Sequence, residues 1–200
     1  MSNFTVLNQK SSLMKIRILA PALIFFALNS IHGQGFTPPW GDNAVIYFAR
    51  VSDYGYAVSF EFFHQDQYIG AFKGKNYMRY ELEPGQQLLW ASSENKEFLT
   101  ADLQPGGTYI VIVDVVIGFW KGHVGFTPIS VNDTDLFLRA KALIISEPPV
   151  DIPMQEITKM NKKLAKFIPE MLDRYENEWK NEHNFRHISP EMAIPPNKMH

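Results

Sequence analysis

The chain has no cysteine among its 200 residues. That absence excludes disulfides, thiolate metal sites and a cysteine nucleophile, and it also excludes a lipid-anchored cysteine behind a leader peptide. An excess of positive charge is missing as well, because 19 Lys and Arg stand against 21 Asp and Glu. Such a chain is a poor candidate for electrostatic binding to nucleic acid.

Acidic residues are absent from the first 33 positions, whose basic residues are Lys10, Lys15 and Arg17. An apolar run over residues 16–28 follows, and then the small-residue stretch 30–33. This order is typical of a secretory signal, and the apolar run is shorter than the roughly 20 residues that span a bilayer. We therefore predict a signal peptide over residues 1–33, cleaved after Gly33, with Met14 as an alternative start.

Without that segment, 19 minus 3 leaves 16 Lys and Arg against 21 Asp and Glu, a net charge of −5. No other stretch is long and apolar enough to cross a membrane. The composition, 46% hydrophobic and 20% charged, is that of a chain able to bury a core. We expect an exported protein, periplasmic or at the cell surface.

Short apolar or alternating runs follow one another through the first two thirds of the chain. They predict strands over residues 44–51, 56–63, 67–72, 76–83, 86–92, 97–103, 108–118 and 123–130. A doubled Leu-x-Pro-Gly motif, at 82–85 and 103–106, predicts turns with a glycine at positive φ. No long helical pattern interrupts the strands, so the sequence favours an antiparallel β-sandwich of about seven or eight strands, or a small barrel.

After residue 130 the periodicity changes to that of helices. Asn132 can cap a short helix over 133–143, with Asp135 as its capping-box partner. We predict a β-sandwich domain over 34–146, a Pro-rich linker over 147–153, an amphipathic helical extension over 154–186 and a disordered tail over 187–200. Pro169 predicts a kink or two abutting helices within the extension.

The extension carries an apolar stripe at helical spacing, formed by Ile157, Leu164, Ile168, Met171, Tyr175 and Trp179. A helix this amphipathic must bury its stripe. The default is docking on the chain's own sandwich, and the alternative is binding of a protein partner or self-association.

Three stretches carry a resemblance to a known family: residues 44–50, Tyr68-Ile69-Gly70, and the two Leu-x-Pro-Gly regions with Gly107-Thr108-Tyr109. Read together, they resemble the uncharacterised DUF2846 family of exported bacterial β-sandwich domains, over about residues 44–130. The resemblance implies an envelope protein and supplies no catalytic residues. The chain departs from the family in lacking a lipoprotein cysteine.

Patterns that would carry catalysis are weak. His64 with Asp66, and His183 with His187, are the nearest approaches to metal-ligand spacing, but each lacks a third ligand. No Gly-x-Ser-x-Gly elbow is present. We therefore predict no metal, no cofactor and no enzymatic activity. Asp114, which interrupts the apolar run 109–117, is expected to reach solvent or pair with a nearby cation.

Aromatic residues make up 14% of the chain and offer a second kind of site. Trp40, Trp90 and Trp120 could line a groove, and Trp120 is the one expected on a loop, near His123 and Asp114 as speculative ligand-binding residues. Two functions stay open: a non-enzymatic binding or assembly module of the bacterial envelope, and a small-ligand or carbohydrate-binding domain. An exposed tryptophan platform would favour the second, and an exposed apolar patch on the helical extension would favour a protein partner.

Overall fold

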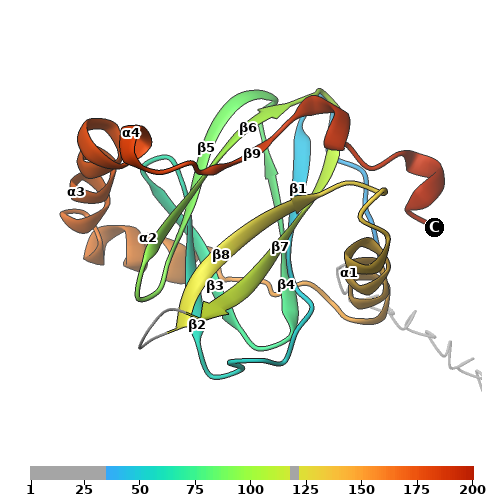
Figure 1. Ribbon diagram of the computed structural model, residues 1–200, viewed down its shortest axis with the longest axis horizontal. Helices are drawn as coiled ribbons and strands as arrows, with labels where there is room; N and C mark the ends of the chain where they lie inside the picture. Colours follow the sequence, from blue (N-terminus) through green and yellow to red (C-terminus); the bar gives the residue numbers. More distant parts are fainter. Residues whose placement is uncertain (1–34, 118–121) are drawn as a thin grey trace, which may run out of the picture. The chain divides into compact units, whose positions relative to one another are not determined.

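The structure, a computed structural model, describes residues 35–117 and 122–200. The predicted signal peptide and Trp120 therefore lie outside the described residues. Within them the chain is mainly β, with two sheets and flanking helices (Figure 1). The predicted sandwich, followed by a short helix and a C-terminal helical extension, is confirmed.

The first sheet has the order β4-β1-β7-β8. Its strands are β1 (Ala44–Arg50), β4 (Asn76–Leu82), β7 (Thr108–Ile117) and β8 (Gly122–Ile129). Every residue of β1 is buried, which explains why this strand is a continuous apolar run rather than an alternating one. Strand β1 is antiparallel to β4 but parallel to β7, so the sheet is mixed. A parallel pair needs a crossover, which the chain supplies by building strands of the second sheet between β1 and β7.

The second sheet has the order β3-β2-β5-β6-β9. Its strands are β2 (Ser59–His64), β3 (Gln67–Lys73), β5 (Gly85–Ser92), β6 (Lys96–Leu103) and β9 (Arg186–Ile188). The glycines of the two Leu-x-Pro-Gly motifs have φ of 93° at Gly85 and 72° at Gly106, as predicted. The second turn is closed by the Gly107 N–H, which donates to the Gln104 carbonyl at 3.0 Å.

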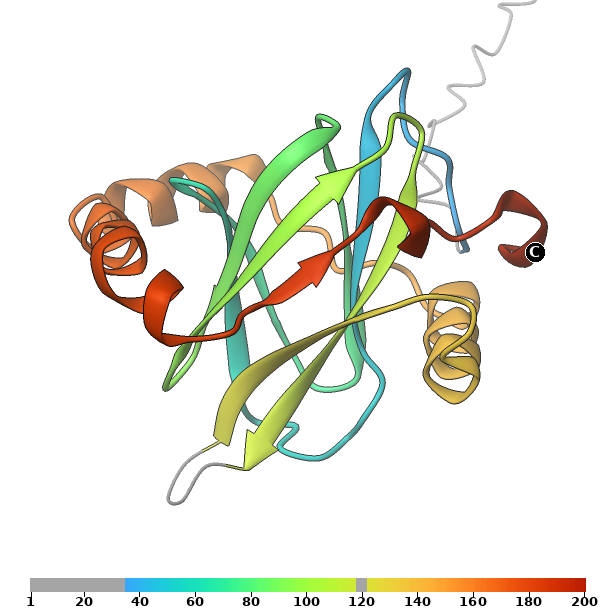
Figure 2. The same cartoon turned by 45° about the horizontal axis from the view of Figure 1, so that its top comes forward.

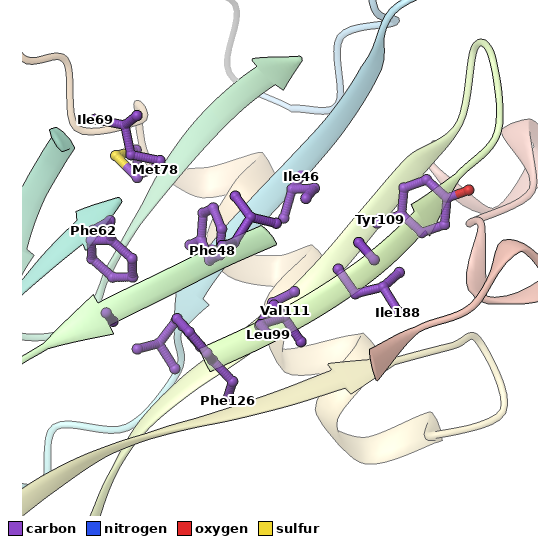
Figure 3. Packing of buried hydrophobic residues seen from close by; sticks show 14 of the residues in the cluster. Ile46, Phe48, Phe62, Ile69, Met78, Leu99, Tyr109, Val111, Phe126 and Ile188 are labelled. Atoms are coloured by element: carbon purple, nitrogen blue, oxygen red, sulfur yellow. The ribbon is translucent and has the colours of Figure 1, made fainter. Parts of the chain in front are cut away.

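Alternate residues of the two sheets meet in the main core (Figure 3). Ile46 and Phe48 of β1 face Phe62 of β2 and Leu99 of β6 across it, and all four are at most 1% exposed. Phe62 stacks on Phe72 with ring centroids 4.9 Å apart. The core thus follows directly from the alternation that predicted the strands.

Helices cover the outer face of each sheet (Figure 2). Helix α1 (Thr134–Ser146) packs Phe137 and Leu143 on the first sheet. The extension forms α2 (Met154–Lys163), α3 (Phe167–Arg174), the π-helix η1 (Tyr175–Trp179) and α4 (Lys180–Glu182). Pro169 lies in the first turn of α3, where its missing N–H costs nothing, so the prediction of two abutting helices is confirmed. In the described part of the chain no helix is long and apolar enough to cross a membrane.

The apolar stripe of the extension lies on the second sheet. Ile168, Met171 and Tyr175 are at most 8% exposed, and Tyr175 stacks on Phe98 of β6 at 4.4 Å. Leu164 and Trp179 pack against the same cluster, and Ile157 is half-buried. Docking on the chain's own sandwich is therefore what the structure shows. The sheet covers the first three side chains but only part of the other three, so binding of a partner by the stripe stays a prediction.

Two local predictions differ from the structure. Asn132 does not cap α1; the residue before the helix is Asp133, whose carboxylate accepts from the Ser130 N–H at 2.8 Å. The tail over 187–200 is not disordered, because Ile188 and Ile194 are 1% and 2% exposed. The Ile194 N–H also donates to the Thr108 carbonyl at 2.7 Å. These two isoleucines and the pairing of β9 with β6 fix the tail on the domain. The sequence does not show this, because the Pro-rich segment has no periodic pattern.

Asparagine side chains cover exposed backbone at one edge of each sheet. Asn161 of α2 accepts from the Tyr68 N–H at 2.9 Å and donates to the Tyr68 carbonyl at 3.1 Å, on edge strand β3. Asn95 makes the same pair of bonds with Val124 of edge strand β8, at 2.8 and 2.9 Å. An amide side chain here replaces a neighbouring strand, which protects the edge from pairing with another chain.

Candidate functional site

Two of the predicted ligand-binding residues share one face of the first sheet. The inward-facing neighbours Val113 and Val124 belong to the main core, so Asp114 and His123 project to the outer face. The register places Asp114 opposite Gly125 and His123 opposite Val116. Burial raises the pKa of the Asp114 carboxyl, against the opposing charges of Arg139 and Arg50. Asp114 is half-buried on the outer face, and these two arginines are the cations whose charge acts on it.

Arg50 is directed away from this outer face. It lies between the sheets, fully buried, with its guanidinium 4.9 Å from the centre of the Phe60 ring. The guanidinium donates to the carbonyls of Val58, Tyr54 and Gly55 at 2.6–2.8 Å. These three hydrogen bonds hold the loop between β1 and β2 in place, so Arg50 has a structural role.

The histidines weighed as metal ligands have other partners. His64 Nε2 lies 2.8 Å from the Gln87 side-chain oxygen, and Nδ1 lies 3.0 Å from the Tyr80 hydroxyl. The Gln87 amide nitrogen donates to the Glu83 carbonyl at 3.0 Å. That bond points the Gln87 oxygen at His64, so Nε2 carries the proton and Nδ1 accepts from Tyr80. His187 Nδ1 is 2.9 Å from the Thr100 hydroxyl. Among the described residues no group of three or more metal-ligating side chains comes together.

The aromatic residues divide sharply between core and surface. Trp90 is fully buried, stacked on Phe63 at 3.7 Å, with its indole N–H donating to the Gln65 carbonyl at 3.0 Å. Trp40 is 85% exposed, although it belongs to a segment that is firmly attached to the domain. An exposed tryptophan on an anchored backbone is the strongest sign of a site in the described chain.

Glu81, on the outer face of β4, anchors that segment. One carboxylate oxygen accepts from the Trp40 N–H at 2.6 Å and from the Asn43 amide at 3.1 Å. The other oxygen pairs with Arg79 at 2.9 Å, and Arg79 also donates to the Pro38 carbonyl at 3.2 Å. Burial alone would raise the pKa of Glu81, but these hydrogen bonds and the Arg79 charge lower it below its ordinary value.

A hollow of about 420 Å³ lies beside the indole. We call it the Trp40 corner; its lining residues are Thr37, Pro38, Pro39, Trp40, Arg79, Glu81 and Pro149. Three prolines and the tryptophan give it rigid apolar walls, and the Arg79–Glu81 pair gives it a polar floor. The Arg79 Nε is buried and has no hydrogen-bond partner within the described residues. Apolar walls with a few fixed polar groups are typical of small-ligand sites.

A scan against protein-family models finds no match to this chain. Searches of the curated proteins and of the solved structures find none either. The resemblance to DUF2846 is thus neither supported nor contradicted.

The sequence predicts Trp120 as the tryptophan on a loop, whereas the exposed tryptophan within the described residues is Trp40. The signal for Trp40 was the run Pro38-Pro39-Trp40-Gly41 before the first strand, where prolines cannot join a sheet ladder. What the sequence could not show is the anchor, because Glu81 lies 41 positions further along the chain.

Proposed function

We propose that this chain is an exported carbohydrate-binding module of the bacterial envelope, with the Trp40 corner as its binding surface. The observation that carries the proposal is an indole 85% exposed on a backbone held by Glu81. The negative face of an indole attracts the polarised C–H groups of a sugar ring. Because the backbone is already fixed, stacking orders only the side chain and loses little conformational entropy.

The polar floor supports the same proposal. Arg79 and Glu81 are 23% and 22% exposed in their side chains, so they can reach a ligand while staying fixed by each other. The planar guanidinium of Arg79 can donate to one sugar hydroxyl, and the planar carboxylate of Glu81 can accept from the neighbouring hydroxyl. Ligand binding is favoured over assembly, because half of the stripe that could have bound a partner (Ile168, Met171 and Tyr175) is buried on the second sheet.

The test is an oligosaccharide array probed with the purified protein and with the Trp40→Ala variant. Trp40 is so exposed that its truncation should leave the free energy of unfolding within about 0.5 kcal/mol of wild type. We expect the wild-type protein to bind at least one saccharide on the array. The Trp40→Ala variant should bind it at least tenfold more weakly, a loss of about 1.4 kcal/mol in binding free energy.

The matched control is Tyr56→Ala, because Tyr56 is also an exposed aromatic, at 72%, and lies outside the Trp40 corner. This variant should bind like wild type. Retention of no saccharide, or equal binding by the Trp40→Ala variant, would refute the proposal.

A further inference from the structure

The helices of the extension cover only part of the second sheet's outer face. Trp90 and Phe98, paired across β5 and β6, lie beneath Tyr175 and Trp179. The next cross-strand pairs on that face are Leu88 with Thr100 and Gln86 with Asp102. These pairs line a groove of about 590 Å³, which we call the β5–β6 groove.

The walls of the groove come from two elements of the C-terminal segment. His187 of β9 forms one side and is hydrogen-bonded to Thr100 at 2.9 Å. Tyr175 and Glu176, at the start of the π-helix η1, form the other side. Single π-turns occur frequently at functional sites, and this one places a carboxylate over the sheet.

The charges in the groove have one sign. Its lining holds the carboxylates of Asp102 and Glu176, and among the described residues that line it there is no lysine or arginine. Glu176 contacts Lys180 through one oxygen, which leaves its other oxygen for a ligand. Side-chain amides of Gln65 and Gln86 add further acceptors, and Leu88 forms an apolar floor.

We propose that the β5–β6 groove binds a primary alkylammonium group together with its carbon chain. An ammonium donates three hydrogen bonds and carries the opposite charge to the lining, while methylenes can lie on Leu88. The group can come from a free polyamine or from a lysine side chain of a peptide. This inference uses none of the residues of the Trp40 corner, so it does not depend on the proposed function.

The experiment is calorimetric titration of the purified protein with three probes: cadaverine, Nα-acetyl-lysine amide and pentanediol. We expect the amines to bind and the uncharged diol to bind at least about tenfold more weakly, as the loss of a charge-assisted hydrogen bond predicts. Tighter binding of cadaverine would indicate a polyamine, and tighter binding of the lysine derivative would indicate a peptide.

Three variants test the assigned charges. Asp102→Asn should weaken amine binding about fivefold, the range of one exposed ion pair. Lys180→Gln removes the cation that competes for Glu176, so it should tighten amine binding. The matched control is Glu178→Gln, because Glu178 belongs to the same π-helix but pairs with Arg174 away from the groove; it should change nothing.

Equal affinity for cadaverine and pentanediol would overturn the inference. So would absence of amine binding at millimolar concentration, or an Asp102→Asn variant that binds both amines as wild type does. The Trp40→Ala variant should bind amines normally, so failure of this inference and failure of the proposed function are separately visible.

Discussion

The amide of Asn161 is predicted to contribute more to stability than its place on a largely exposed helix suggests. Helix α2 has no buried residue, yet Asn161 satisfies both backbone groups of Tyr68. The Asn161→Ala variant removes both hydrogen bonds to Tyr68, each worth about 1 kcal/mol, and a further bond to the Ile157 carbonyl of its own helix. Asn161 is half-buried rather than buried, so water can replace part of what is lost. We therefore expect a loss of about 1–2 kcal/mol in the free energy of unfolding.

Urea unfolding followed by circular dichroism measures this loss. The midpoint should fall while the slope stays unchanged, because the surface exposed on unfolding is the same. A second variant, Asn161→Asp, keeps the acceptor for the Tyr68 N–H but places a carboxylate against the Tyr68 carbonyl. It should be at least as unstable at neutral pH and recover part of the loss in acid, where a protonated carboxyl can donate.

The matched control is Asn177→Ala, because the Asn177 amide bonds only to Asp173 on its own helical segment. It should cost less than about 0.5 kcal/mol. If Asn161→Ala and Asn177→Ala have equal stability, the edge-covering role of Asn161 is refuted.

Three further substitutions test other parts of the structure. The Arg50→Met variant should lose about 2–4 kcal/mol in the free energy of unfolding measured in urea, because three loop carbonyls lose their donor. A loss no larger than that of a surface substitution, about 0.5 kcal/mol, would contradict the role assigned to Arg50. Glu81→Gln should cost about 1 kcal/mol at neutral pH. The lowered pKa of Glu81 means that the ionised carboxylate stabilises the folded state, and this stabilisation is lost as the pH falls through that pKa. The difference in the free energy of unfolding between the variant and wild type should therefore disappear in acid and persist in base. Ile168→Ala should cost about 2–4 kcal/mol, and an unchanged thermal midpoint would show that α3 is not docked on the sheet.

The strands were predictable because their side chains alternate. Met78, Tyr80 and Leu82 face the core along β4 while Arg79 and Glu81 face out, and the sequence shows that alternation directly. Pairing was not predictable in the same way. The parallel pair of β1 and β7 depends on which strands the chain builds between them, and no local pattern reports that.

The tail and the sites were missed for a related reason. Ile188 and Ile194 are isolated apolar residues among prolines and charges, so their burial is decided by the shape of the sheet they meet. The backbone of Trp40 is held by Glu81, and the β5–β6 groove lies where η1 and β9 meet the second sheet. Long-range contacts of this kind leave no periodic signal in the sequence.

The most direct test of carbohydrate binding at the Trp40 corner uses the indole N–H signals of the 4 tryptophans in an NMR spectrum. The Trp40 signal is assigned by its loss in the Trp40→Phe variant, and Trp90, bonded to the Gln65 carbonyl in the interior, is the internal reference. Titration with the best saccharide from the array should shift the Trp40 signal in a saturable way and leave Trp90 unmoved. A bound saccharide that leaves the Trp40 signal in place, or shifts both signals equally, would contradict the account.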